Sequence, residues 1–242
     1  MISNPPVASE TSRAVGAFLR AEPECFREWI QCRPANLIGF CVAAIVIGAG
    51  SYGAAIGCWR DSWQALYTGI KLPLVILLTT LGNGLLNGML APLLGLNVTF
   101  RQSLAAVLIS FAVTAMVLGA LSPVALFIVC NTPPLTTGTK MTSPQYALLQ
   151  LTLAVFVALA GVLGNLQLLP LLRQWAGNAA TARNVLLAWL AGNLFLGSQI
   201  SWVLRPFIWE ANRPVEFIGT NSFHGSFFET VFKAAGRLWL PG

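Results

Sequence analysis

The sequence predicts an all-α, polytopic membrane protein with five transmembrane helices, and two observations support that prediction. Hydrophobic residues make up 56% of the 242 residues and charged residues only 9%, whereas about a quarter of an ordinary soluble domain is charged. Five stretches contain no Asp, Glu, Lys, Arg or His, and each exceeds the roughly 20 apolar residues that cross a bilayer. These stretches are Asn36–Trp59, Leu72–Gly95, Ser103–Cys130, Tyr146–Leu172 and Asn184–Leu204.

The five stretches define one membrane domain, which we expect to cover residues 36–204. They take up more than half of the chain, so little room remains for a separate globular domain of about 100 residues. Residues 1–35 form the predicted N-terminal tail, and residues 205–242 form the predicted C-terminal tail. The N-terminal tail lacks the apolar core of a cleaved signal peptide, so the first span is expected to direct insertion.

Both tails are expected to lie along the membrane surface. In the N-terminal tail, apolar residues recur at near-helical spacing between charges of both signs, which favours short interfacial helices. In the C-terminal tail, Ser226 and Glu229 have the spacing of a capping box, and the residues after them predict an amphipathic helix. The last span ends among aromatic and basic residues typical of an interfacial anchor, namely Trp202, Arg205, Phe207 and Trp209.

The distribution of Lys and Arg predicts a cytoplasmic N-terminus and a C-terminus on the opposite side. The positive-inside rule counts basic residues close to the spans. Counted in this way, the side of the N-terminus has six and the other side has five. The first group is Arg20, Arg27, Arg33, Arg101, Arg173 and Arg183, and the second is Arg60, Lys71, Lys140, Arg205 and Arg213.

Small and polar residues follow particular faces of three spans. In the second span, Thr79, Asn83 and Asn87 lie on one helical face, and Gly84 and Gly88 lie on the stripe beside it. Small residues let helix backbones approach, and amides can hydrogen-bond across to another helix. The fourth span has a related row, Ala154, Ala158, Gly161 and Asn165, and the fifth has Asn193, Gly197 and Ser201, with Gln199 on another face.

These side chains permit two interpretations. An unpaired amide in hydrocarbon is costly, so the asparagines are expected either to pair with one another or to line a water-filled path. Helix packing is the favoured interpretation, because membrane helix interfaces are enriched in these residue types.

Catalytic, metal and cofactor sites are not expected. The spans lack the ionisable side chains that proton and ion relays use. His224 is the single histidine, and its closeness in sequence to Ser222, Ser226 and Glu229 does not supply the geometry of a catalytic triad. The five cysteines show no CxxC pair. The basic residues are dispersed, so the net charge of +6 indicates anionic lipid head groups as partner and no nucleic acid.

The order of features resembles the Yip-domain family of small membrane proteins. The likeness is most specific at Tyr67-Thr68-Gly69-Ile70-Lys71-Leu72-Pro73, where a basic residue and a proline lead into the second span, and at Leu94-Gly95-Leu96 before the third. The resemblance implies five spans and a role in membrane organisation and protein assembly. Some eukaryotic members of that family engage small GTPases, but the N-terminal tail shows no segment that identifies such binding.

The sequence therefore predicts a scaffold or accessory subunit of an integral membrane complex, with other membrane subunits or copies of itself as partners. An oligomeric channel is the alternative, in which Asn83, Asn87, Asn165, Asn193 and Gln199 would form an uncharged polar lining. A third possibility is a membrane-bound enzyme that uses the segment around His224.

Overall fold

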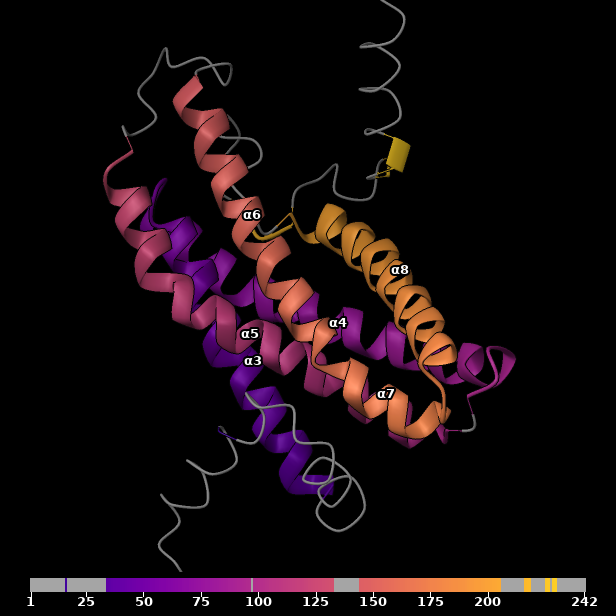
Figure 1. The fold of residues 1–242 in the computed structure, drawn as a ribbon. Helices are drawn as coiled ribbons and strands as arrows, with labels where there is room; N and C mark the ends of the chain where they lie inside the picture. Colours follow the sequence, from indigo (N-terminus) through magenta and orange to yellow (C-terminus); the bar gives the residue numbers. More distant parts are fainter. Residues whose placement is uncertain are drawn as a thin grey trace, which may run out of the picture.

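The predicted all-α membrane fold is confirmed. In the computed structural model of the chain, the described residues are Gly16, 34–96, 98–132, 144–205, 216–218, 225–226 and 228–229. This part of the chain contains no strand, and five of its helical segments are long and apolar enough to cross a membrane. The helices are α3 (Pro34–Gly57), α4 (Ser62–Leu93), α5 (Phe100–Cys130), α6 (Pro144–Leu166), α7 (Leu168–Ala176) and α8 (Ala179–Leu204), shown in Figure 1.

Helix α4 begins well before the charge-free stretch that predicted it. The Asp61 side chain caps the helix by accepting a hydrogen bond from the Ser62 N–H at 2.7 Å. From Leu72 to Leu93 the helix is about 33 Å long at ~1.5 Å per residue, which already matches the hydrocarbon core of a bilayer. The ten residues before Leu72, among them Lys71, therefore extend the helix toward or beyond the membrane surface.

The fourth predicted span is divided into α6 and α7. Helix α6 ends at Leu166, and Gln167 forms the turn before α7. Pro170 explains the position of this break, because proline has no N–H to donate to the carbonyl four residues earlier and its ring collides with that carbonyl. The carbonyl concerned belongs to Leu166, the last residue of α6. By contrast, Pro73 and Pro123 lie inside continuous helices.

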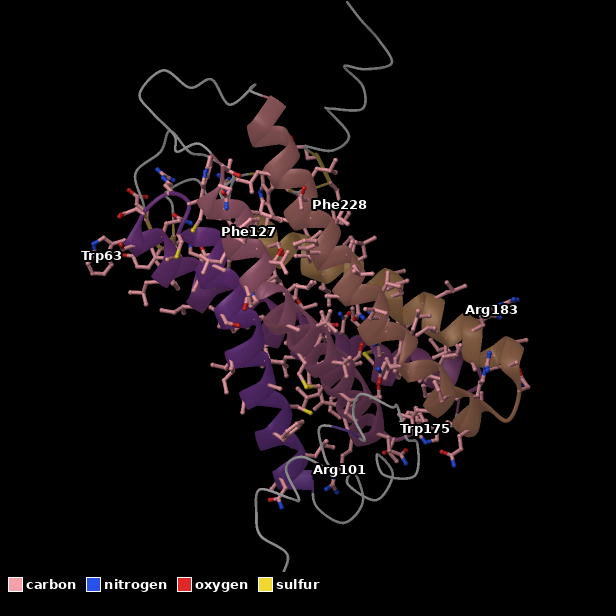
Figure 2. All side chains as sticks on the ribbon, turned by 60° about the vertical axis from the view of Figure 1, so that its left-hand side comes forward. Trp63, Arg101, Phe127, Trp175, Arg183 and Phe228 are labelled. Carbon is pink, nitrogen blue, oxygen red and sulfur yellow. The ribbon has the colours of Figure 1, made fainter. Side chains whose placement is uncertain are left out.

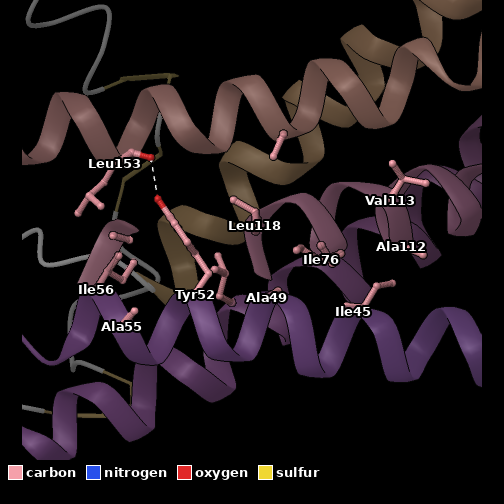
Figure 3. Packing of buried hydrophobic residues seen from close by; sticks show 14 of the residues in the cluster. Ile45, Ala49, Tyr52, Ala55, Ile56, Ile76, Ala112, Val113, Leu118 and Leu153 are labelled. Carbon is pink, nitrogen blue, oxygen red and sulfur yellow. Dashed lines mark hydrogen bonds between the residues drawn. The ribbon is translucent and has the colours of Figure 1, made fainter. Parts of the chain in front are cut away.

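Helix α3 packs on α4 and α5 with its backbone in direct contact with theirs. A Cβ atom added at Gly48 would lie 2.1 Å from the Ala115 carbonyl oxygen of α5, and one added at Gly53 would lie 2.5 Å from the Thr68 carbonyl oxygen of α4. Only glycine fits at these two contacts. Figure 3 shows part of the apolar cluster that α3 forms with α4, α5 and α6, where the Tyr52 hydroxyl donates a hydrogen bond to the Leu153 carbonyl oxygen of α6 at 3.1 Å.

A second apolar cluster joins α7 and α8 to α4 and α5. Trp189 of α8 is fully buried there with Leu168, Leu171 and Leu172 of α7. Many large apolar side chains elsewhere on the bundle are exposed, such as Leu163 of α6 and Leu194 of α8. In a five-span membrane protein this outer surface is the one that faces lipid or other membrane helices.

Two of the basic residues counted for orientation, Arg101 and Arg183, lie toward the same end of the bundle. Figure 2 shows Arg101, Trp175 and Arg183 toward one end of the bundle and Trp63 toward the other. Which end faces the cytoplasm stays a prediction. The helices run from Pro34 to Leu204, whereas most of the two tails lies outside the described residues.

Candidate functional site: an asparagine cluster between α4, α6 and α8

The polar face of α4 is buried inside the protein. Asn83 and Asn87 have no exposed surface, and Thr79 has 2%. The three side chains lie one helical turn apart, so they form a continuous polar row of about 12 Å along the helix. The row faces α8, because Gly192 of α8 lies against both asparagines and Gly197 lies against Thr79.

Three asparagines from three helices form one hydrogen-bonded relay. Asn83 Nδ2 of α4 donates to Asn193 Oδ1 of α8. Asn193 Nδ2 donates to Asn165 Oδ1 of α6 at 3.0 Å, and Asn165 Nδ2 donates to the Gly161 carbonyl oxygen at 2.8 Å. Two of the three bonds cross between helices, so the relay ties α4, α8 and α6 together.

Several polar atoms beside the relay have no hydrogen-bond partner among the described residues. On α4 they are Thr79 Oγ1, Asn83 Oδ1 and both polar atoms of Asn87. On α8, the indole Nε1 of Trp189 also lacks a hydrogen-bond partner among the described residues. Each buried polar group without a partner costs about 1–3 kcal/mol. The relay therefore satisfies only part of the polar surface that α4 buries.

The two predicted faces of α4 contact different helices. A Cβ atom at Gly84 would lie 2.3 Å from Leu104 Cδ1, and one at Gly88 would lie 2.6 Å from Phe100 Cδ2. Leu104 and Phe100 belong to α5. The glycine stripe thus lets α5 approach, while the amide stripe beside it faces α8.

The small-residue row of α6 does not pack as the sequence suggested. Ala154 and Ala158 are exposed, and no other part of the described chain lies within 4 Å of a Cβ atom placed at Gly161. The face that α6 buries against α5 instead includes Leu149, Leu153 and Ala160. Only Asn165, at the end of the row, reaches another helix by a side-chain hydrogen bond.

The predicted anchor at the end of α8 is described in part. Arg205 ends the helix with a left-handed backbone (φ 44°), and its guanidinium lies 5.0 Å from the centre of the Trp202 ring. Gln199, which lies three residues before Trp202, is half-buried. Phe207 and Trp209 lie outside the described residues, as does His224.

Described residues of the C-terminal tail contact α8. The Ser226 hydroxyl accepts a hydrogen bond from the Glu229 N–H at 3.1 Å, which is one half of the predicted capping box. The Phe228 ring stacks on Phe195 of α8 with centroids 5.1 Å apart. The rest of the predicted amphipathic helix lies outside the described residues.

Sequence reasoning missed a second polar feature, which surrounds Lys71. This side chain is 4% exposed, donates from Nζ to the Glu216 carbonyl oxygen at 3.3 Å and lies 5.3 Å from the centre of the Phe217 ring. Tyr67, one turn earlier, meets the same ring edge-on at 5.5 Å. In the sequence, Lys71 lies just before the second predicted span, and the four-residue spacing of Trp63, Tyr67 and Lys71 is the signal that could have placed it on a helix face.

Fold and site together define the class of the protein: it is an integral membrane protein of five apolar helical spans with an uncharged polar cluster inside the bundle. Within the described residues, no group of three His, Cys, Asp or Glu side chains could hold a metal ion. The chain matches no protein-family model, no curated protein and no solved structure. The resemblance to the Yip-domain family therefore stays a prediction.

Proposed function

We propose that the protein is a scaffold or accessory subunit of a membrane complex and that it receives a transmembrane helix of a partner subunit beside α6. The observation that carries the proposal is the outward small-residue row of α6, formed by Ala154, Ala158 and Gly161. Rows of this kind let a second helix come close in a bilayer, where close packing drives helix association.

Helix α8 carries a row beside this surface that is partly covered by α4, because Gly197 lies against Thr79 and Asn193 bonds to Asn83. Asn193, Gly197 and Ser201 repeat at four-residue intervals, and all three are half-buried. Because Asn193 is bonded to Asn165, the rows of α6 and α8 begin at the same point and run toward the same side of the membrane. The two helices are not extensively packed against each other. A partner helix would therefore use the row of α6 together with the part of the α8 row that α4 leaves uncovered.

The lipid-facing flank of α6 offers matched controls. Val162 and Leu159 are exposed, large and apolar, and each is the direct neighbour of a residue in the row. A photo-crosslinking amino acid at Ala158 is expected to capture a co-purifying membrane chain, whereas the same probe at Leu159 is expected to capture lipid. Gly161→Leu should release that chain from the particle purified in mild detergent, and Val162→Leu should leave it bound.

Two results would contradict this proposal. One is a purified particle with the mass of a single chain and no crosslink from position 158. The other is a stoichiometric complex that survives Gly161→Leu unchanged. Recovery of identical copies crosslinked through position 158 would make the partner a second copy of this chain, and the accessory-subunit role would then fail.

The second candidate is a pore, which is favoured by the row of buried polar atoms on α4. The relay asparagines bond to one another inside one chain, so a polar path would run through each bundle rather than between subunits. Asn83→Leu and Asn87→Leu would then abolish solute flux into liposomes, whereas in a scaffold they would alter stability or assembly alone.

A further inference from the structure

Two amide oxygens converge on one glycine at the interface of α4 and α8. A Cβ atom placed at Gly192 would lie 3.2 Å from Asn83 Oδ1 and 3.8 Å from Asn87 Oδ1. Both asparagines are fully buried. Neither oxygen has a hydrogen-bond partner among the described residues.

The direction of the relay determines which atom Asn83 turns toward Gly192. A backbone carbonyl can only accept, so Asn165 must direct its NH₂ group at the Gly161 oxygen and keep Oδ1 for Asn193. Asn193 must then donate to Asn165, and its own oxygen accepts from Asn83. Every amide in the relay is therefore oriented in one sense, and the far end presents Asn83 Oδ1, an acceptor.

A group bound beside Asn83 Oδ1 must donate a hydrogen bond to it, because the relay fixes the orientation of that amide, and Asn87 faces the same place with Oδ1. It should also be neutral, because none of the helices α3 to α8 contains Asp or Glu to balance a buried cation. A molecule with two donor hydrogens could serve both oxygens at once, which is what water does when it bridges buried polar groups.

We propose that the α4–α8 interface beside Gly192 is a binding site for one small neutral hydrogen-bond donor, a water molecule, that bridges Asn83 Oδ1 and Asn87 Oδ1. A Cβ atom at Gly192 would already press on Asn83 Oδ1 at 3.2 Å, so glycine is the residue that leaves the two oxygens unobstructed. This site is independent of the partner surface proposed above, because Gly192 faces α4 whereas that surface includes the outward row of α6.

The chemistry of the site can be tested by comparing Gly192→Ala with Gly192→Ser. The alanine methyl group obstructs the approach to the two oxygens and supplies no donor hydrogen, so the oxygens stay unpaired. Serine fills the same space but brings its own O–H donor. We expect Gly192→Ala to lower the thermal midpoint of the purified protein by about 2–4 °C, the shift that corresponds to about 1 kcal/mol in a chain of this size. Gly192→Ser should recover most of that loss.

Gly82 provides the control in the same interface. A Cβ atom there would meet the apolar Cδ1 atom of Leu196 of α8 at 3.0 Å, and nothing else within 4 Å. A serine can also bond to its own helix backbone, and the Gly82 pair measures that effect. At Gly82, serine should therefore be no better than alanine. If serine at Gly192 is equally or more destabilising than alanine, the site acts by shape alone and the proposal is wrong.

The identity of the donor needs a separate measurement. In protein labelled with ¹⁵N-asparagine, an NMR cross-peak from water to the Asn87 side-chain amide is expected, and Gly192→Ala should remove it. Absence of that cross-peak in the unmodified protein would overturn the assignment to water. Thermal midpoints are expected to be the same in Na⁺, K⁺ and ammonium chloride. Stabilisation by one of these ions that Gly192→Ser removes would identify a cation site instead.

Discussion

The relay predicts that Asn193 contributes more to stability than any other polar side chain of α8. Asn193→Leu removes two hydrogen bonds between helices and leaves Asn83 Nδ2 and Asn165 Oδ1 buried without partners. Hydrogen bonds between membrane helices contribute about 0.6 kcal/mol on average and up to about 1.7 kcal/mol. The free energy of unfolding should therefore fall by about 1.2 kcal/mol and by no more than about 3.4 kcal/mol.

The measurement is reversible unfolding of the purified protein in mixed micelles or bicelles, with Ser198→Leu as the matched control. Ser198 lies on the same helix, and its hydroxyl donates only to the Phe195 carbonyl oxygen of that helix. The control should change stability by less than about 0.5 kcal/mol. A double-mutant cycle of Asn193→Leu with Asn165→Leu should give a coupling energy close to the value of one bond. Zero coupling, or equal losses for Asn193→Leu and the control, would refute the relay.

Three further outcomes are expected from contacts elsewhere in the bundle. Tyr52→Phe removes the hydrogen bond to α6 and should lower the free energy of unfolding by about 0.5–1.5 kcal/mol; an unchanged unfolding curve would contradict that bond. Lys71→Met removes the donor and the cation that contact Glu216 and Phe217, so limited proteolysis should cut at these residues faster than in Lys71→Arg. Gly48→Val should cost at least about 1–3 kcal/mol because the side chain meets the backbone of α5, whereas Gly39→Val, with open space around it, should leave the thermal midpoint close to that of the parent chain.

The number of spans could be predicted from the sequence because a bilayer imposes one strong condition on every span. Charges are excluded from the hydrocarbon core, so the gaps between charged residues mark the crossings. The same reasoning predicted a start for the second span at Leu72, ten residues after the start of α4, because the charge-free stretch begins only after Lys71. The helix nevertheless continues through Lys71, whose charge is shielded by a segment 145 residues further along the chain. No local pattern contains that contact.

The candidate site was predictable in its residue types and less so in its partners. Four-residue spacing correctly placed Thr79, Asn83 and Asn87 on one buried face. It could not tell which of two faces α6 would bury, because Leu149 and Leu153 form as plausible an interface as Ala154 and Ala158. The choice depends on how α5 and α6 fit together around Gly164, where an added Cβ would lie 2.6 Å from the Ser110 carbonyl oxygen. Because that fit depends on the side chains of both helices, the pattern within α6 alone could not predict it.

The relay connects α6 and α8, two helices that are not extensively packed against each other. Helix α6 is held mainly by α5, and α8 is held mainly by α4 and α7. Between α6 and α8 the Asn165–Asn193 bond replaces backbone contact, so it fixes the separation of the two small-residue rows. In Asn165→Leu the rows should therefore be free to change their spacing while α5 still holds α6. Distances between spin labels at positions 158 and 201 should broaden in this variant and stay narrow in Ser198→Leu. A distribution unchanged by Asn165→Leu would mean that the loops and α7 alone set the spacing, and the partner surface would then not depend on the relay.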